Sequence, residues 1–390
     1  MNLLMLDISG KVTKYTFWVS EAIRKSLYPT DSIVVYASMY KSEERDYKKF
    51  SPNLAYKKLL NMIPEKYKRS FSILKRLIKS VEVLLNYIYV ICSVKVKGID
   101  VVHTQYIPFA DFISIEYYAY KLIHLLCPNT KLVLTIHDVL PHDLKPENKE
   151  AYCKRYSKVA SMFDAYMVHT RSCKEDVINY LHLPEGKIHI AYHPIFESVY
   201  VKPSKNEILN NKRIRLIMFG LQTPYKGTDI LIDALNELPI EISSRYEVTI
   251  AGSIEETYLK DLQKKCCNIS VEWLPYFVPE KDLDERINES NIIVLPYRSI
   301  SQSGVLLLSL FFKKLIITSN LPSFKESLEG YEKQWFFETG NANDLARLLR
   351  DIVEGKINVR KQQQIIDDLN EKYSPARFAE RTIAVYKDIQ

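Results

Sequence analysis

The chain has 390 residues, of which 47% are hydrophobic and 26% are charged. This balance is typical of a globular protein and excludes a disordered or collagen-like chain. The length favours two domains, because one hydrophobic core rarely serves so many residues. The net charge of +7, from 54 Lys and Arg against 47 Asp and Glu, is too small for this length to indicate a nucleic-acid partner.

The cysteines, the first residues and the apolar runs bear on where the protein works. The six cysteines show neither paired metal-ligand spacing nor a disulfide framework, so we expect free thiols in a reducing cytoplasm. The chain starts directly with a strand pattern, without the basic and small-residue flanks of a signal peptide. The longest apolar run, residues 81–94, contains Glu82 and Asn86 and is expected to be too short to span a bilayer.

The first half of the chain alternates apolar runs with amphipathic stretches. Buried strands are expected at residues 3–8, 32–37, 99–103, 131–136, 165–168 and 188–193. Helices are expected at residues 11–26, 73–94, 112–126 and 148–162, and from the capping box Ser172–Glu175 onward. The stretch 43–79 is polar and basic, with apolar residues at helical spacing.

A polar stretch rich in Lys and Asn, residues 200–212, is typical of a linker, and the alternation restarts after it. Strands are expected at residues 215–219, 246–251, 269–274, 292–295 and 315–318, with helices at 228–238, from 303, at 343–354 and at 374–390. Alternating strands and helices predict a parallel sheet with helices on both faces. Because the pattern occurs twice, we predict two doubly wound α/β domains.

Two loops of the second half have the composition of a phosphate site. The first, Gly220–Gly227, follows a strand and contains Lys226. The second, residues 296–302, follows another strand and leads into a helix through Ser303 and Gly304. A strand that turns into a helix through small residues gathers free backbone N–H groups at the positive helix end, which binds phosphate. Both loops are expected at the carboxyl edge of a parallel sheet, so we predict a phosphate-bearing ligand there.

Several motifs, in their order along the chain, resemble those of the glycosyl transferases group 1 (glycosyltransferase family 4), which are retaining enzymes with the GT-B fold. These motifs are Thr135-Ile-His-Asp138, Phe219–Gly227, Leu295-Pro-Tyr-Arg298, Ser301-Gln-Ser-Gly304, the block 315–326, Phe337–Ala346 and Tyr373–Tyr386. The resemblance covers nearly the whole chain and is strongest from Ile99 onward. It implies two Rossmann-like domains that face an interdomain cleft, with a C-terminal helix that crosses back onto the N-terminal domain.

The resemblance also implies how the chain divides and what it does. The expected parts are an N-terminal acceptor-side domain (1–197), a linker (198–212), a nucleotide-sugar-binding domain (213–373) and the returning helix (374–390). The implied activity is transfer of a hexose, with retention, from a UDP- or GDP-sugar to a glycan acceptor, which we expect to be lipid-linked, in cell-surface polysaccharide biosynthesis. We expect a cytoplasmic location, peripheral on the inner face of the plasma membrane. No cofactor and no metal are expected, because lysine and helix-end amides can stabilise the leaving diphosphate.

The resemblance assigns roles to single residues. His137, at a strand end, is expected to work at the donor sugar, and Lys226 at the diphosphate, so both are predicted to be catalytic. The predicted donor-binding residues are Gly10, Gly220, Gln222, Lys226, Tyr297, Ser301, Gln302, Ser303, Gly304, Ser309 and Glu326. Charged residues that the family usually carries are replaced by Leu221, Ser301 and Ser309.

Purely structural roles compete with these functional ones. His137 fits a core or capping histidine, Ser303 an N-cap, and Glu326 an acid at a helix N-terminus. The basic, aromatic stretch 56–97 fits either amphipathic helices that cover the sheet or a face that docks on anionic lipid. For the whole protein, one alternative is a non-catalytic scaffold subunit of the same fold, suggested by the three replacements. The other is a sugar-nucleotide epimerase or phosphorylase, and an epimerase needs no acceptor.

Overall fold

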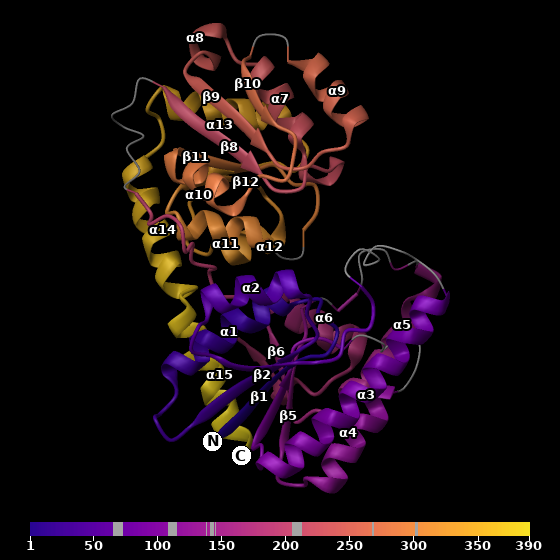
Figure 1. The fold of residues 1–390 in the computed structure, drawn as a ribbon. Coiled ribbons are helices and arrows are strands. Elements are labelled where there is room, and N and C mark those ends of the chain that lie inside the picture. Colours follow the sequence, from indigo (N-terminus) through magenta and orange to yellow (C-terminus); the bar gives the residue numbers. More distant parts are fainter. Residues whose placement is uncertain are drawn as a thin grey trace. The chain divides into compact units, whose positions relative to one another are not determined.

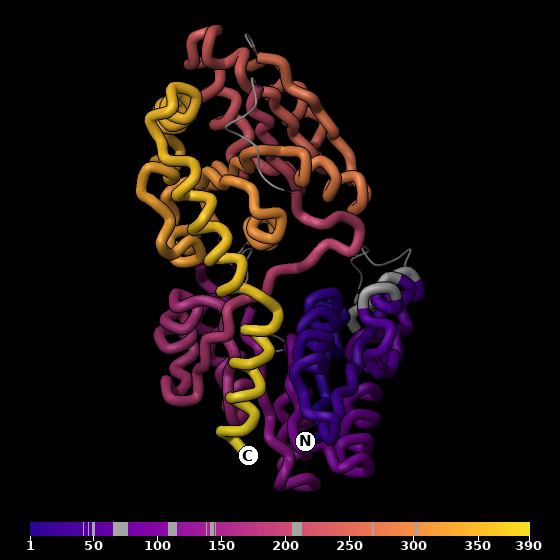
Figure 2. The backbone as a smooth tube through the Cα atoms, turned by 90° about the vertical axis from the view of Figure 1, so that its left-hand side faces the viewer, coloured from indigo at the N-terminus to yellow at the C-terminus, as the bar shows by residue number. Residues whose placement is uncertain are grey.

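The computed structural model describes residues 1–64, 73–107, 115–137, 139–140, 144, 146–204, 213–266, 269–300 and 303–390, without the side chains of residues 42, 46, 49, 50 and 73–76. The chain forms two compact units (Figures 1 and 2). Unit 1 contains Met1–Pro194 together with Pro375–Gln390, and unit 2 contains Ile195–Ser374. Each unit is a parallel sheet covered by helices.

Unit 1 is built on seven parallel strands in the order β3-β2-β1-β4-β5-β6-β7. They are β1 (Asn2–Asp7), β2 (Ser32–Ala37), β3 (Ala55–Lys58), β4 (Val101–Thr104), β5 (Lys131–Thr135), β6 (Ala165–Val168) and β7 (Ile188–Ile190). The central strand β1 pairs with β2 from Asn2 opposite Ser32 and with β4 from Leu3 opposite Val101. Its apolar residues are buried on both faces, as expected for a parallel sheet between helix layers.

Helices cover both faces of this sheet. They are α1 (Thr13–Ser26), α2 (Lys41–Phe50), α3 (Ile73–Lys97), α4 (Ile115–Leu126), α5 (Lys149–Ala160), α6 (Arg171–Leu181) and α15 (Pro375–Ile389), with short 3-10 turns η2 (Pro146–Asn148) and η3 (Glu185–Lys187). Helices α3, α4, α5 and α6 share one core with Leu4 and Leu6 of β1. The side chain of Met5, which lies between Leu4 and Leu6, points to the opposite face of the sheet. On that face the sulfur of Met5 contacts Tyr386 of α15, and α15 packs on α1.

Unit 2 contains six parallel strands in the order β10-β9-β8-β11-β12-β13. The strands are β8 (Ile214–Phe219), β9 (Tyr246–Ala251), β10 (Val271–Leu274), β11 (Ile292–Leu295), β12 (Leu315–Ser319) and β13 (Phe336–Phe337). The helices are α7 (Thr228–Asn236), α8 (Ile240–Ser243), α9 (Glu256–Lys265), α10 (Glu280–Glu289), α11 (Gly304–Phe311), α12 (Pro322–Ser327), α13 (Ala342–Val353) and α14 (Val359–Lys372), with 3-10 turns η5 (Pro224–Lys226) and η6 (Lys333–Trp335). The central strands β8 and β11 are neighbours, which places the loops that follow them side by side.

The predicted α/β class with two parallel sheets is confirmed, and so is the return of the C-terminal helix to the first unit. Strand β3 was not predicted, because the stretch 43–79 has a helical pattern. Its sequence Ala-Tyr-Lys-Lys lies at the edge of the sheet, where one side of the strand meets solvent and lysines are common. The apolar part of α3 is also longer than predicted, since Leu77–Lys97 is long and apolar enough to cross a bilayer by length and composition alone.

Candidate functional site

Gly220 marks the point in unit 2 where β8 turns toward α7. Its φ of +97° is a conformation that glycine adopts without strain. A Cβ at this position would lie 3.1 Å from Nζ of Lys226 and 3.3 Å from a methyl group of Val305. The structure therefore brings together the Gly220 loop, Lys226 and the first turn of α11, three features that were predicted to bind phosphate.

The loops that follow β8 and β11 are in direct contact with each other. Gly227 has a φ of +73°, and a Cβ there would lie 1.9 Å from the carbonyl oxygen of Pro296, so the two backbones touch. The guanidinium of Arg298 donates to both carboxylate oxygens of Asp229, at 3.0 and 2.7 Å, and to the carbonyl of Pro224 at 2.6 Å. Bidentate pairing of this kind fixes geometry as well as charge. Sequence reasoning gave Arg298 no such role.

Lys226 is the central cation of this site. Its side chain is buried, with 7% of the residue exposed, and Nζ lies 3.2 Å from the hydroxyl of Tyr297 and 4.9 Å from the centre of that ring. Burial lowers the pKa of Lys226 to about 8. In the described part of the chain, no carboxylate forms an ion pair with it. Among the described residues, this buried ammonium group has a phenol and an aromatic face as partners, which compensate its charge poorly, so an anionic ligand would be strongly favoured.

The N-terminus of α11 lies next to Lys226. Ser303 is its N-cap and accepts a hydrogen bond from the backbone N–H of Leu306 at 3.1 Å. Gly304 opens the helix, and a Cβ at this glycine would meet nothing within 4 Å. The first backbone N–H groups of a helix lack helical acceptors, so they remain available to a phosphate oxygen. Capping and phosphate binding are therefore compatible at Ser303.

Three other predicted donor-binding residues, Gln222, Ser309 and Glu326, lie in different surroundings. Gln222 is buried, and its amide donates to the carbonyls of Gly220 (2.8 Å) and Ala251 (3.4 Å), so its side chain shapes the loop. Ser309 is buried within α11, where its hydroxyl donates to the carbonyl of Val305 at 2.7 Å. Glu326 is half-buried and lies in the last turn of α12, so its interpretation as an acid at a helix N-terminus is wrong.

Three residues of the sequence motifs lie outside the described residues: Asp138, Ser301 and Gln302. Tyr297 is well placed and buried beside Lys226, and its ring packs on Phe324 of α12 with ring centres 5.5 Å apart. Burial raises the pKa of Tyr297, so its hydroxyl keeps its proton.

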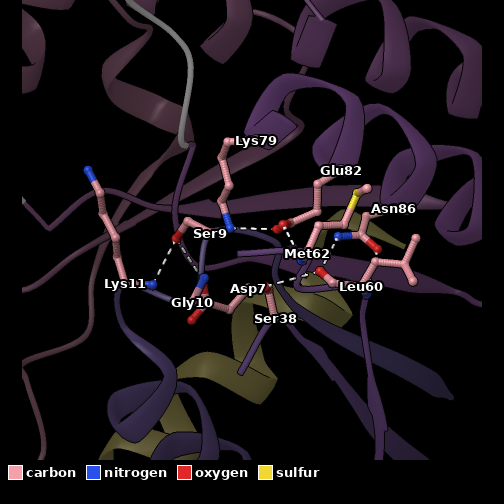
Figure 3. Close-up of polar contacts among 10 residues, drawn as sticks. All are labelled: Asp7, Ser9, Gly10, Lys11, Ser38, Leu60, Met62, Lys79, Glu82 and Asn86. Carbon is pink, nitrogen blue, oxygen red and sulfur yellow. Dashed lines mark hydrogen bonds and ion pairs between the residues drawn. The ribbon is translucent and has the colours of Figure 1, made fainter. Parts of the chain in front are cut away.

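In unit 1, Gly10 belongs to a loop that Asp7 holds at the end of β1 (Figure 3). The buried carboxylate of Asp7 accepts from the hydroxyl of Ser9 (2.9 Å), from the N–H of Gly10 (3.0 Å) and from the hydroxyl of Thr13 (3.0 Å). Burial raises the pKa of Asp7. Gly10 has a φ of +68°, and a Cβ there would lie 2.2 Å from the carbonyl oxygen of Ser38. The backbone approach to Ser38 alone explains this glycine.

His137 follows β5 and belongs to an aromatic and polar cluster. Its ring centre lies 4.7 Å from that of Tyr15 and 5.3 Å from that of His169. Burial, with His169 and His193 as lesser causes, holds the pKa of His137 well below its ordinary value, so the ring is neutral. A neutral imidazole can both donate and accept hydrogen bonds to sugar hydroxyls.

The cluster holds polar atoms that lack partners in the described part of the chain. They are Nε2 of His137, Nε2 of His169, the hydroxyl of Tyr15 and both side-chain polar atoms of Gln105. Buried polar groups are nearly always satisfied, so a ligand or ordered water is expected here. Sequence reasoning found only His137. Gln105 and His169 also follow directly after buried strands, and this position is the signal that identifies them.

Other features of the described residues bear on cofactors and cavities. No group of three or more His, Cys, Asp and Glu side chains could hold a metal ion within these residues. Two cavities, of about 600 Å³ beside Arg213 and Arg286 and about 880 Å³ beside Cys153 and Tyr180, contain none of the predicted site residues.

Comparison of the sequence with known proteins gives two related results. Residues 201–368 match the family described as glycosyl transferases group 1, a segment that includes Gly220 and Lys226 and excludes Gly10 and His137. A GDP-mannose:glycolipid 4-beta-D-mannosyltransferase of Xanthomonas campestris pv. campestris is 27% identical over 125 residues, which are 32% of this chain and 35% of that protein. The chain thus matches only about a third of the length of this relative.

Solved structures extend the likeness to the whole chain. HepE of Anabaena, in complex with UDP, has a TM-score of 0.69 and 14% identity, and the match covers 100% of both chains. UDP-GlcNAc 2-epimerase of Neisseria meningitidis, bound to UDP-GlcNAc, has a TM-score of 0.60 and 10% identity, again over 100% of both chains. At these identities the likeness shows the fold alone, and the predicted GT-B fold is confirmed. Transferases and epimerases share this fold, so it does not choose between them.

Proposed function

We propose that the chain, whose residues 201–368 match the glycosyl transferases group 1 family, moves a hexose from a UDP- or GDP-sugar to a glycan acceptor. The observation that carries this proposal is the buried Lys226, whose ammonium group lies beside Gly220 and Tyr297 with no carboxylate partner in the described residues. The donor diphosphate would receive hydrogen bonds from Lys226 and from the first N–H groups of α11.

The same groups would assist the chemistry. As the bond to the sugar breaks, negative charge grows on the leaving diphosphate, and Lys226 with the amides of the Ser303–Gly304 turn would stabilise that charge. This arrangement requires no metal ion. We assign the neutral His137 of unit 1 to hydrogen bonding with hydroxyl groups of the sugar, which suits an imidazole whose Nε2 has no other partner in the described residues.

The comparisons support the classes of donor and acceptor. HepE was solved with UDP, and the Xanthomonas relative is described as acting on GDP-mannose and a glycolipid. We therefore propose a UDP- or GDP-sugar as donor and a lipid-linked glycan as acceptor. The enzyme would then contribute to cell-surface polysaccharide biosynthesis from the inner face of the plasma membrane.

The stereochemical outcome has two candidates. Retention is implied by the group 1 resemblance. Inversion is favoured by the relative, whose name specifies a β-linked mannose, because the mannose of common GDP-mannose is α-linked and a β product inverts it. It is also favoured by Ser301 and Ser309, because the resemblance to the group 1 family implies glutamates at these two positions in many retaining members. The one-bond coupling constant between the anomeric carbon and its hydrogen, measured by NMR on the transferred sugar of the product, separates the two outcomes.

The first experiment is thermal unfolding with a panel of nucleoside diphosphates and sugar nucleotides. A ligand present at 100 times its dissociation constant stabilises the folded state by about 2.7 kcal/mol. We expect UDP or GDP to stabilise the wild type and to lose this effect in Lys226→Ala. Stabilisation that persists in Lys226→Ala would remove Lys226 from the site.

Turnover then separates the remaining functions. Transfer from the stabilising sugar nucleotide to a glycolipid fraction supports the proposal. Conversion of the sugar nucleotide without any acceptor would show an epimerase instead. A protein that binds the nucleotide and transforms nothing would be a scaffold subunit.

A further inference from the structure

Helix α3 carries an exposed stripe that is entirely apolar. From residue 77 to residue 94, its exposed side chains are Leu77, Val81, Leu84, Leu85, Ile88, Tyr89 and Cys92. The first six are between 41% and 60% exposed. Intervals of three and four residues place them on one side of the helix, opposite the stripe that packs on the sheet.

Helix α4 continues this stripe. It lies beside α3 (Figure 1), and the two helices meet at Tyr87 and Tyr120, whose hydroxyl oxygens are 3.2 Å apart. Both helices pack on the same side of the sheet, so their exposed sides point away from it together. The exposed apolar side chains of α4 are Tyr118, Leu122, Leu125 and Leu126. We call these four residues and the seven of α3 the apolar face.

The polar residues within α3 hold the helix on unit 1. Glu82 and Asn86 are buried, and both bind the backbone of the segment that follows β3 (Figure 3). The carboxylate of Glu82 accepts from the N–H of Met62 at 2.8 Å and from Lys79 at 2.6 Å. Asn86 accepts from the N–H of Leu60 at 2.9 Å and donates to its carbonyl at 3.0 Å. These contacts hold the apolar face at the surface.

The exposed charges on the described side chains of α3 and α4 have one sign. The acidic residues of α3 and α4 in the described part of the chain, Glu82 and Glu116, are both 0% exposed. Among the described side chains of these two helices, the exposed charged ones are Lys95, Lys97 and Lys121. None of these lysines pairs with a carboxylate within the described residues. Two copies of this face would bring like charges together, whereas anionic lipid headgroups would neutralise them.

We propose that the apolar face docks on an anionic lipid bilayer, with α3 and α4 lying along the interface. Leucine, isoleucine and tyrosine would enter the boundary between headgroups and acyl chains, and the lysines would meet the anionic headgroups. The proposal deepens the proposed function, on which it rests for its purpose, because docking would hold unit 1 where a lipid-linked acceptor is found. The docking itself is a separate property that vesicles alone can test.

The test is sedimentation of the full chain with vesicles of phosphatidylcholine, with or without phosphatidylglycerol. The wild type is expected to bind the anionic vesicles. The double variant Leu84→Glu/Ile88→Glu is expected to bind at least roughly tenfold more weakly, because two apolar contacts become charges. Lys95→Glu and Lys97→Glu are each expected to weaken binding about fivefold or more. The matched control is Ile240→Glu/Phe277→Glu, at unit 2 residues that are 66% and 79% exposed, and it should bind like the wild type.

Several results would overturn the proposal. Absence of wild-type binding to anionic vesicles is one, and equal binding by the Leu84/Ile88 variant with a normal unfolding temperature is another. A wild-type dimer that this variant converts to a monomer, without vesicle binding, would make the face a self-association surface instead. Stabilisation by UDP or GDP is measured without vesicles on the same variants. It tells a failure of docking apart from a failure of the proposed transferase function.

Discussion

Replacing Lys226 by methionine should weaken nucleotide binding and strengthen folding at the same time. The charge-assisted hydrogen bond from this ammonium group to a phosphate oxygen contributes about 1.5–3 kcal/mol. The affinity for UDP or GDP should therefore fall roughly 10- to 100-fold. Methionine keeps most of the side-chain volume between Gly220 and Tyr297, so the loop itself should persist.

The gain in stability follows from the pKa. Burial lowers the pKa of Lys226 from 10.5 to about 8, and a shift of this size at a buried group corresponds to about 3 kcal/mol of destabilisation at pH 7. Methionine removes that cost, and a gain of about 1–3 kcal/mol in the free energy of unfolding is expected. The unfolded chain holds this proton up to higher pH than the folded chain. The gain should thus be constant below pH 8 and shrink as the pH rises from 8 to 10.5.

Calorimetric titration with UDP and GDP, together with urea unfolding, measures both effects. Lys314 provides a matched control, since it is buried with its pKa also lowered to about 8. Its Nζ donates to the carbonyl of Asn288 at 2.5 Å, away from the loops that hold Lys226. Lys314→Met should leave nucleotide affinity unchanged. Unchanged nucleotide affinity in Lys226→Met, or a decrease in its free energy of unfolding, would refute the reasoning.

Two further outcomes concern unit 1. Burial lowers the pKa of His103 to about 3 and that of His169 to about 4. The unfolded chain takes up these protons near pH 6.5 and the folded chain does not, so the free energy of unfolding should fall by about 2 kcal/mol per histidine between pH 7 and pH 5. In urea unfolding at both pH values, this fall should be about 2 kcal/mol smaller in His169→Gln than in the wild type. An equal fall in the two proteins would contradict this. Gly10→Ala should lower the free energy of unfolding by roughly 2–4 kcal/mol, because the new Cβ would meet the carbonyl of Ser38. At Gly98 a Cβ would meet nothing within 4 Å, so Gly98→Ala should lower it by about 1 kcal/mol. Equal urea midpoints of the two variants would contradict the contact with Ser38.

Much of the fold is readable in the sequence because strands and helices of α/β units leave different periodic patterns. Strands such as 292–295 are continuous apolar runs, and they were located within one residue. The place of the loop that contains Gly220 and Lys226 was also predicted, since this loop follows a predicted strand. Neighbouring strands then bring their loops together, as β8 and β11 do.

What the sequence hides is the partner that each polar side chain meets. Gln222 and Arg298 look alike as loop residues, yet one is enclosed by backbone carbonyls and the other ties two loops through Asp229. The partners of Arg298 are about 70 residues away in the chain, and a pairing over such a distance leaves no local pattern. The same holds for Tyr15, which only the fold places beside His137.

Helix α15 has a consequence for how the protein is made. Tyr386 on this helix hydrogen-bonds His103 at the centre of unit 1, and Phe378 packs beside Tyr15. All of unit 2 lies between these partners in the chain, so a ribosome completes unit 2 before α15 emerges. The first half of the nascent polypeptide must then wait, with an uncovered apolar surface, while the later half can already fold. The part that is synthesised first is therefore the part expected to need a chaperone longest.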